Sequence, residues 1–194
     1  MTWSAGDVAI VTPLVVDALE AVNVRYRIGG SVASSALGKP RSTLDIDIAC
    51  ELAMRHVDVF VARLEPAFYV DADVVRDAIR RRSSFNVIHL ETMLKVALFI
   101  RRDRPFEDVA FERCVRKPLD REPGIRVYDV TTSEDIILHK LEWYRMGGGV
   151  SERQWIDVVE VIAMQEDALD LAYLRHWAGE LGVSDLLERA LAKA

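Results

Sequence analysis

The chain has 194 residues, of which 51% are hydrophobic and 29% are charged, so it can bury a core and is not a disordered polypeptide. Its 25 basic and 31 acidic side chains give a net charge of −6, which argues against general DNA binding, because non-specific affinity for nucleic acid comes from basic charge. Cys50 and Cys114 are too few for a disulfide framework, and no signal peptide or membrane-spanning apolar run is recognisable. We therefore expect a cytoplasmic protein with no membrane partner.

The N-terminal part of the chain alternates between helical and strand patterns. Thr12 and Pro13 are typical of the first positions of a helix, and apolar residues follow them at helical spacing. Residues 24–28 alternate as a short strand, and residues 32–37 predict a short helix. Residues 44–48 alternate strictly between apolar and acidic side chains, which predicts a second strand with its acids on one face.

Helices are then expected at about residues 53–64 and 72–82. The apolar, branched runs 85–90 and 95–100 are separated by a few residues, which suggests a hairpin. Residues 127–130 are expected to add a further strand.

Beyond Thr131 the pattern becomes helical, and the whole acidic excess of the chain lies in residues 131–194. Thr132 with Asp135 approximates a capping box, which opens a helix that ends at three consecutive glycines. The sequence therefore predicts an α+β protein, with a mixed sheet flanked by helices in a domain at residues 1–130 and a helical C-terminal region at residues 131–194. Three further helices are expected: one that begins near Ser151, one at about residues 169–181 and one at residues 184–191.

The segment with the most chemical information joins a glycine-rich turn to a pair of acids. Gly29, Gly30 and Ser31 follow the first strand, and glycines there let the backbone approach a ligand closely. The short helix after them begins with N–H groups that suit a phosphate. Asp45 and Asp47 lie two residues apart on a strand, where their carboxylates can grip Mg²⁺ together with phosphate oxygens. Taken singly, the diglycine is an ordinary turn and the acids an ordinary solvated strand.

The order of Gly-Gly-Ser, short helix and Asp-x-Asp resembles the nucleotidyltransferase superfamily built on the DNA polymerase β-type palm. The resemblance is closest to the bacterial minimal and AbiEii-like nucleotidyltransferases, and it also covers residues 95–99, 134–141 and 153–158. It implies a palm-like fold, an NTP as substrate, and transfer of a nucleotidyl group to a hydroxyl. The implied acceptors are a tRNA, a protein or a small molecule, and the toxin-like members imply a cognate antitoxin as partner.

The resemblance also assigns roles to individual residues. Asp45 and Asp47 would coordinate Mg²⁺, and Lys140 and Asp157 would match the catalytic lysine and aspartate of the helical half. The residues assigned to the nucleotide and its phosphates are Gly29, Gly30, Ser31, Arg41 and Lys95. Two alternatives stay open, because Arg41 is equally a solvated loop residue and Lys140 with Asp157 is equally an ordinary buried ion pair.

One position departs from the family pattern. The family places a third carboxylate on a neighbouring strand, whereas this chain reads Lys95-Val96-Ala97-Leu98, with Ala97 at that position. Without that acid, catalysis is expected to fall steeply, because a group that helps deprotonate the acceptor is missing. His89 or Glu91 could substitute if the hairpin register brings them to the site. The alternative is a protein that binds a nucleotide or a partner without transfer.

Two further features admit more than one interpretation. The basic clusters at residues 80–82 and 101–104 either guide the phosphate of an RNA or nucleotide or form a solvated surface, and the second is the better candidate for guidance. Trp143, Trp155 and Trp177 occupy helical positions with apolar neighbours and are expected in the core.

Overall fold

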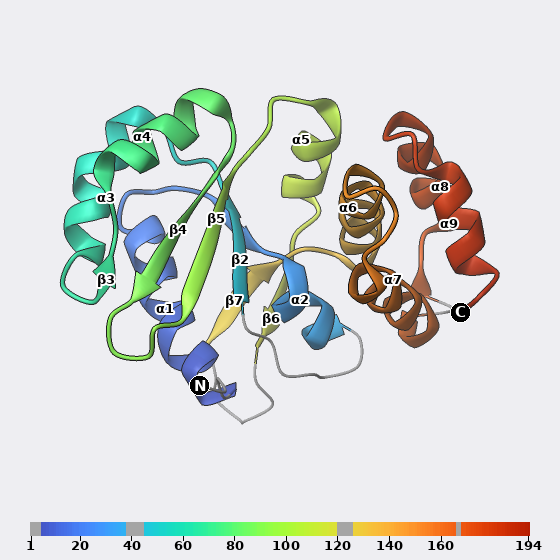
Figure 1. The fold of residues 1–194 in the computed structure, drawn as a ribbon, viewed down its shortest axis with the longest axis horizontal. Coiled ribbons are helices and arrows are strands. Elements are labelled where there is room, and N and C mark those ends of the chain that lie inside the picture. Colours follow the sequence, from blue (N-terminus) through green and yellow to red (C-terminus); the bar gives the residue numbers. More distant parts are fainter. Residues whose placement is uncertain (1–4, 38–44, 120–125, 166–167) are drawn as a thin grey trace.

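The computed structural model describes residues 5–37, 45–119, 126–165 and 168–194. Within these residues a mixed sheet of seven strands forms the centre of the protein (Figure 1). Strand β2 runs parallel to β5 and β1 runs parallel to β7, while the other neighbours are antiparallel. In spatial order the strands are β3 (Phe68–Tyr69), β4 (Ser84–His89), β5 (Lys95–Ile100), β2 (Asp45–Cys50), β1 (Tyr26–Ile28), β7 (Val127–Val130) and β6 (Val115–Pro118).

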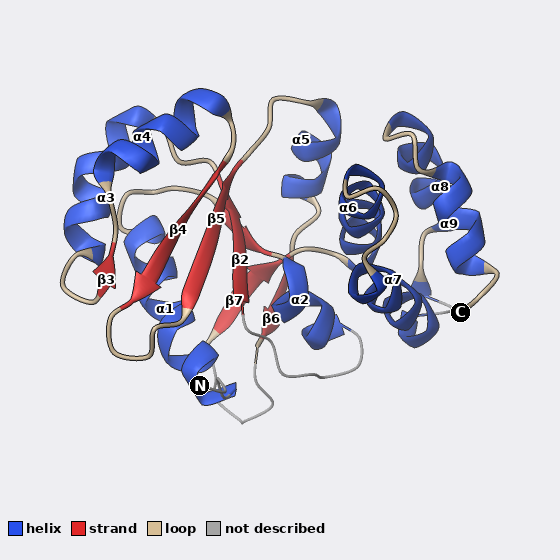
Figure 2. Cartoon of the chain, viewed as in Figure 1, coloured by secondary structure: helices blue, strands red, loops and turns tan. Residues whose placement is uncertain are grey.

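Helices cover the sheet and extend beyond one side of it, as Figure 2 shows. Helices α1, α3 and α4 lie together, whereas α6 to α9 form a group on the opposite side of the view. The helices are α1 (Ala5–Glu20), α2 (Gly30–Leu37), α3 (Val57–Leu64) after a 3₁₀ turn at Met54–His56, α4 (Ala72–Arg81), α5 (Pro105–Glu112), α6 (Ser133–Met146), α7 (Glu152–Gln165), α8 (Leu171–Glu180) and α9 (Ser184–Leu191).

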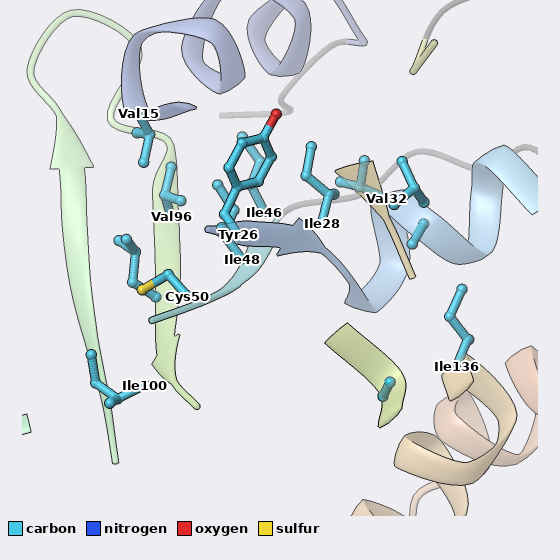
Figure 3. Close-up of a cluster of buried hydrophobic side chains, with 14 of the residues drawn as sticks. Val15, Tyr26, Ile28, Val32, Ile46, Ile48, Cys50, Val96, Ile100 and Ile136 are labelled. Atoms are coloured by element: carbon cyan, nitrogen blue, oxygen red, sulfur yellow. The ribbon is translucent and has the colours of Figure 1, made fainter. Parts of the chain in front are cut away.

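The two faces of the central strands have different surroundings because side chains alternate along a strand. Ile46, Ile48 and Cys50 of β2 are fully buried on one face, where Val15 of α1 and Val96 of β5 pack with them (Figure 3). Asp47 and Ala49 alternate with these residues and therefore occupy the other face. The apolar face holds the core, and the opposite face is available for a site.

The predicted α+β fold is confirmed. The hairpin of β4 and β5 pairs antiparallel, as the two apolar runs predicted, and α9 spans the residues expected for it. Thr132 caps α6 by accepting a hydrogen bond from the N–H of Asp135 at 3.3 Å. Strand β7 ends at Val130 and α6 begins at Ser133, while the division of the chain into domains 1–130 and 131–194 stays a prediction.

The sequence interpretation was wrong about the start of the first helix and missed three elements. Helix α1 begins before Thr12 and contains Pro13, although proline removes one backbone hydrogen bond. Val11 and Leu19 are fully buried on either side of Pro13, so burial along the whole helix outweighs the local preference. The missed elements are β3, α5 and β6. Helix α5 begins with Pro105 at its first position, a start signal that was present in the sequence.

None of the helices in the described ranges combines the length and apolar composition needed to cross a bilayer.

Candidate functional site

A cavity of about 450 Å³ lies on the polar face of the sheet and is lined on its other side by residues of α6. Its lining includes Gly29, Gly30, Ser31 and Asp47, which we call the glycine end. It also includes Arg82, Phe99, Arg102 and Trp143, which we call the arginine end. Asp47 pairs in register with Ala97, and Arg102 follows Ala97 by five residues, which corresponds to roughly 16 Å along an extended chain.

The glycine end is fixed by the backbone. The N–H of Gly29 donates to the carbonyl oxygen of Asp47 at 2.9 Å, and Gly30 adopts a positive φ of 56°. A Cβ at residue 30 would lie 1.8 Å from Oδ2 of Asp47, so the carboxylate occupies the space that any side chain there would need. The sequence motif therefore forms one unit, in which the turn and the acidic strand are in direct contact.

The first turn of α2 opens into this end of the cavity. The N–H of Ala33 donates to the carbonyl oxygen of Gly29 at 3.1 Å, so Gly29 is the residue from which the helix starts. Ser31 lies in the first turn and lines the cavity. The first N–H groups of an α-helix suit an anion, because they point out of its positive end.

The remaining residues assigned to the nucleotide have different placements. The backbone of Asp45 begins β2 and pairs in register with Lys95, but the side chain of Asp45 lies outside the described part. Lys95 is exposed at the start of β5 and does not contribute to the cavity lining described above. Arg41 lies outside the described residues.

Lys140 and Asp157 form a buried ion pair across α6 and α7. The Lys140 Nζ donates to Oδ2 of Asp157 at 2.7 Å and to Oε1 of Gln154 at 3.2 Å. Lys140 also lines the cavity. The two interpretations of this pair, a buried structural ion pair and a functional lysine and aspartate, are compatible. The buried carboxylate of Asp157 can hold the ammonium group of Lys140 at the wall of the cavity.

Within the described ranges, no carboxylate takes the place of the third acid of the family. Ala97 is the β5 residue in register with Asp47, and Asn86 of β4 is in register with Ala97. His89 is buried at the far end of β4, where its ring contacts Phe68. Neither His89 nor Glu91 belongs to the cavity lining, so the register removes both as substitutes.

The floor of the arginine end is a buried charged cluster. The Arg27 guanidinium donates to Oε2 of Glu107 at 2.6 Å and contacts Nε2 of His139 at 2.8 Å. Arg27 and Glu107 are both buried, while His139 lies on α6. Because a guanidinium can only donate, Nε2 of His139 accepts and the ring proton resides on Nδ1.

Burial and the neighbouring Arg27 charge hold the pKa of His139 well below its usual value, so the ring is neutral at pH 7. With its basic nitrogen already bonded, His139 is poorly suited to accept a proton from a substrate. Arg104 donates to Oε2 of Glu142 at 2.8 Å and to Oε1 of Glu107 at 2.8 Å. Burial is the largest single influence on Glu142 and would raise its pKa, but the hydrogen bonds from Arg104 together with the charges of Arg104 and Arg102 hold that pKa below its ordinary value.

The mouth of the arginine end carries an aromatic pair and two arginines. Trp143 is 44% exposed, which contradicts the expectation that it lies in the core, whereas Trp155 is buried as expected. The rings of Trp143 and Phe99 meet edge to face, with centroids 6.2 Å apart. Arg82 and Arg102 belong to the two basic clusters noted in the sequence, and both line the cavity.

The residues that sequence reasoning missed are Arg27, Glu107, His139, Glu142 and Trp143. A usable signal existed for His139 and Trp143, because residues 136, 139, 140 and 143 follow the i, i+3, i+4, i+7 spacing of one helix face. No local signal marks Arg27 or Glu107, which meet only through the fold.

The residues present are compatible with a magnesium ion held partly by substrate. No group of three or more His, Cys, Asp or Glu side chains that could hold a metal occurs among the described residues. A complete protein cage is not required for Mg²⁺, which is usually bound by one or two carboxylates together with substrate phosphates. Asp47 supplies one carboxylate inside the cavity, where a glycine backbone leaves room for its oxygens.

Comparison with known proteins places the fold. No protein-family model matches the chain, and no curated protein does so. Among solved structures it is similar to ANT(2'')-Ia in complex with adenylyl-2''-tobramycin, with a TM-score of 0.58 and 15% identity over 89% of this chain and 95% of that chain. It is also similar to an antigenic nucleotidyltransferase-like protein from Paracoccidioides brasiliensis, with a TM-score of 0.56 and 17% identity over 100% of this chain and 95% of that chain.

These structural neighbours are nucleotidyltransferases, so the chain has a nucleotidyltransferase-like fold, as the Gly-Gly-Ser and Asp-x-Asp resemblance predicted. Identities of this size establish the fold alone. The closer likeness to AbiEii-like proteins stays a prediction.

Proposed function

We propose that the chain is a Mg²⁺-dependent nucleotidyltransferase that transfers a nucleotidyl group from an NTP to a hydroxyl. The observation that carries this proposal is the contact between the Asp47 carboxylate and Gly30, which joins the glycine turn and the acidic strand inside one cavity. Each part alone is ordinary, whereas a phosphate-binding turn in contact with a metal-binding acid is what phosphoryl chemistry requires.

The roles of the chain's residues follow from their positions in the cavity. Asp47, together with Asp45 two residues earlier in β2, would hold Mg²⁺, and a bound Mg²⁺ supplies positive charge that offsets the charge of the phosphates. The glycine turn and the first turn of α2 would bind the β- and γ-phosphates. Lys140 would add a positive charge at the cavity wall, with Asp157 as its positioning residue. Arg41 and Lys95 remain in the proposal as further phosphate ligands.

In the proposed reaction the acceptor oxygen forms a bond to the α-phosphorus of the NTP. The bond from that phosphorus to the bridging oxygen breaks, and its electron pair leaves with pyrophosphate. The proton of the acceptor hydroxyl passes to water, since Ala97 beside Asp47 has no group that can accept it. Such a reaction is expected to be slow, because a positioned general base contributes about 10²–10⁴-fold to a rate.

A second candidate function is binding of a nucleotide without transfer. The observation that favours it is the same alanine, which stands in register with Asp47 where a third carboxylate would complete the site. The contact of Asp47 with Gly30 favours the enzyme, because a protein that only holds its fold has no use for a carboxylate packed against a glycine with a positive φ.

The acceptor and the biological setting belong to the proposal as well. A tRNA or a protein acceptor, a cytoplasmic location and a cognate antitoxin follow from the toxin-like resemblance. The small-molecule acceptor, which the resemblance also implies, is supported by the neighbour in complex with adenylyl-2''-tobramycin.

The test uses the full chain with each labelled NTP, Mg²⁺ and either total RNA or a cell lysate. Transfer of label that is lost in Asp47→Asn supports the enzyme, and Asp73→Asn is the matched control, because Asp73 is an exposed aspartate at the start of α4. Nucleotide-dependent thermal stabilisation without transfer supports the binding protein. If no NTP is transferred and none stabilises the chain, both functions are contradicted.

A further inference from the structure

Arg82 and Arg102 are the least compensated cations at the arginine end. The carboxylate nearest to Arg82 is that of Asp103, and the one nearest to Arg102 is that of Glu142, each at 3.9 Å and among the described residues. Their side chains are 53% and 40% exposed. Arg104, in contrast, has hydrogen bonds of 2.8 Å to its carboxylates. Arg82 also donates to the carbonyl oxygen of Arg101 at 3.3 Å. Because a guanidinium has five N–H donors, both arginines keep donors for an anion at the mouth of the cavity.

Trp143 adds a flat surface beside these charges. Its ring is half-exposed although tryptophan is usually well buried, and Phe99 supports it edge to face. The guanidinium carbon of Arg102 lies 5.9 Å from the centre of the ring. An exposed aromatic ring next to arginines is a surface on which a planar ring can stack while its anionic substituent is bound.

The arginine end is distinct from the part of the cavity that the phosphates of the donor would occupy. Ala49 and Phe99 are in register between β2 and β5, two residues beyond the pair of Asp47 and Ala97. Both Ala49 and Phe99 line the cavity, so its wall continues from the carboxylate to the aromatic pair. A second ligand at the arginine end can thus reach toward the glycine end along one surface.

We propose that the arginine end binds the acceptor, and that the acceptor is a nucleoside monophosphate unit, either free or at the end of an RNA chain. This inference rests on the proposed nucleotidyltransferase function. The phosphate lies between Arg82 and Arg102, the planar base stacks on Trp143, and the ribose hydroxyl faces the glycine end. A cationic acceptor is disfavoured, because it would meet the same two guanidinium charges.

The test measures binding of free nucleoside monophosphates to the full chain by calorimetry, without donor and again with Mg²⁺ and an α,β-methylene NTP analogue. A monophosphate should bind at least about tenfold more tightly than its nucleoside, because its phosphate makes charge-assisted hydrogen bonds. Arg82→Ala and Arg102→Ala should each weaken the monophosphate about tenfold and leave the nucleoside unchanged. Tobramycin, whose amino groups are protonated at neutral pH, should not compete.

Arg81→Ala is the matched control, since it removes the same charge next to Arg82 but from a side chain paired with Asp77 outside the cavity lining. It should bind the monophosphate as the wild-type chain does. Trp143→Ala should weaken the monophosphate and the nucleoside equally, because both stack on the ring. A short RNA that ends in the same nucleotide and binds more tightly than the free monophosphate identifies RNA as the source of the ligand, and equal or weaker binding identifies the free nucleotide.

The inference is overturned if the monophosphate and the nucleoside bind equally, if tobramycin competes, or if Arg81→Ala and Arg102→Ala have the same effect. It is also overturned if Arg102→Ala weakens the NTP analogue instead, because the arginine end then holds the donor. Failure of the proposed function gives a different result, because the NTP analogue itself then does not bind. Binding of the monophosphate is measured in a separate titration and tests only the inference about the arginine end.

Discussion

The two ends of the cavity are built in different ways. At the glycine end, backbone atoms and one carboxylate set the geometry, and the residues come from the turn after β1, the first turn of α2 and strand β2. At the arginine end, long side chains from several distant segments meet around a buried cluster of Arg27, Glu107 and His139. An end made of backbone tolerates almost no change in shape, whereas an end made of long side chains can change its ligand by substitution. The glycine end therefore suits the invariant phosphates of a donor, and the arginine end suits a variable acceptor.

Lys140 lines the cavity and donates to the buried Asp157, so its removal should have a large effect on stability. Lys140→Met leaves Asp157 buried without its cation, which is expected to lower the free energy of unfolding by about 3–5 kcal/mol. The double variant Lys140→Met with Asp157→Leu should recover most of that loss, because the uncompensated charge is gone. Urea denaturation measures both. A double variant as unstable as the single one would show that packing, and not charge, is what Lys140 provides.

Gly30→Ala tests how rigid the glycine end is. The new methyl group would lie 1.8 Å from Oδ2 of Asp47, and the positive φ disfavours any side chain, so the carboxylate must move. Because a displacement of about 1 Å in a catalytic group can cost roughly 10²-fold, nucleotidyl transfer should fall about 100-fold. Gly179→Ala, at a helical glycine with nothing within 4 Å of an added Cβ, is the control and should transfer normally. Normal transfer by Gly30→Ala would contradict the contact as the basis of function.

The difference between the glycine end and the arginine end also explains which parts of the site could be predicted from the sequence. The glycine end was recognisable because residues 29–31 and 47 form a local pattern of turn, short helix and strand. The arginine end was not, because Arg27 reaches Glu107 across a sequence separation of 80 residues and α5 was not predicted at all. Trp143 was assigned to the core because its apolar neighbours on α6 are buried, and helical spacing alone does not say which flank of a buried face borders a cavity.

Ala97→Asp asks whether the proposed transferase site lacks only its third acid. Position 97 of β5 is in register with Asp47 of β2, so an aspartate there would place a second carboxylate beside that of Asp47. This carboxylate could take the proton from the hydroxyl group of the acceptor. Since a general base contributes about 10²-fold or more, we expect transfer to rise at least tenfold. Ala97→Asn has the same size without the charge and should give no increase. Single-turnover transfer measures both, and a rise in the asparagine variant would show that volume is responsible.

The arginine end should also make folding sensitive to acid through His139. Its folded-state pKa lies below the unfolded value, so as the pH falls the unfolded chain takes up the proton first. Stability from this group is therefore complete above about pH 6.5 and declines below it, by about 1 kcal/mol for each pH unit crossed. His139→Gln keeps an acceptor for Arg27 without a titrating ring. Denaturation between pH 7.5 and 5.5 should show a smaller loss in the variant, and an unchanged loss would assign the acid sensitivity to other groups.

The smallest change in the free energy of unfolding is expected for substitution of Trp143. This prediction separates a role of Trp143 in ligand binding from a role in folding. Trp143 is 44% exposed and Trp155 only 6%, although both are tryptophans on neighbouring helices. Trp155→Ala removes a buried ring and should lower the free energy of unfolding by about 3–5 kcal/mol, whereas Trp143→Ala should change it by only about 0.5 kcal/mol. Chemical denaturation of the two variants makes the comparison. If Trp143→Ala is nearly as destabilising as Trp155→Ala, the ring is part of the core and not a surface kept for a ligand.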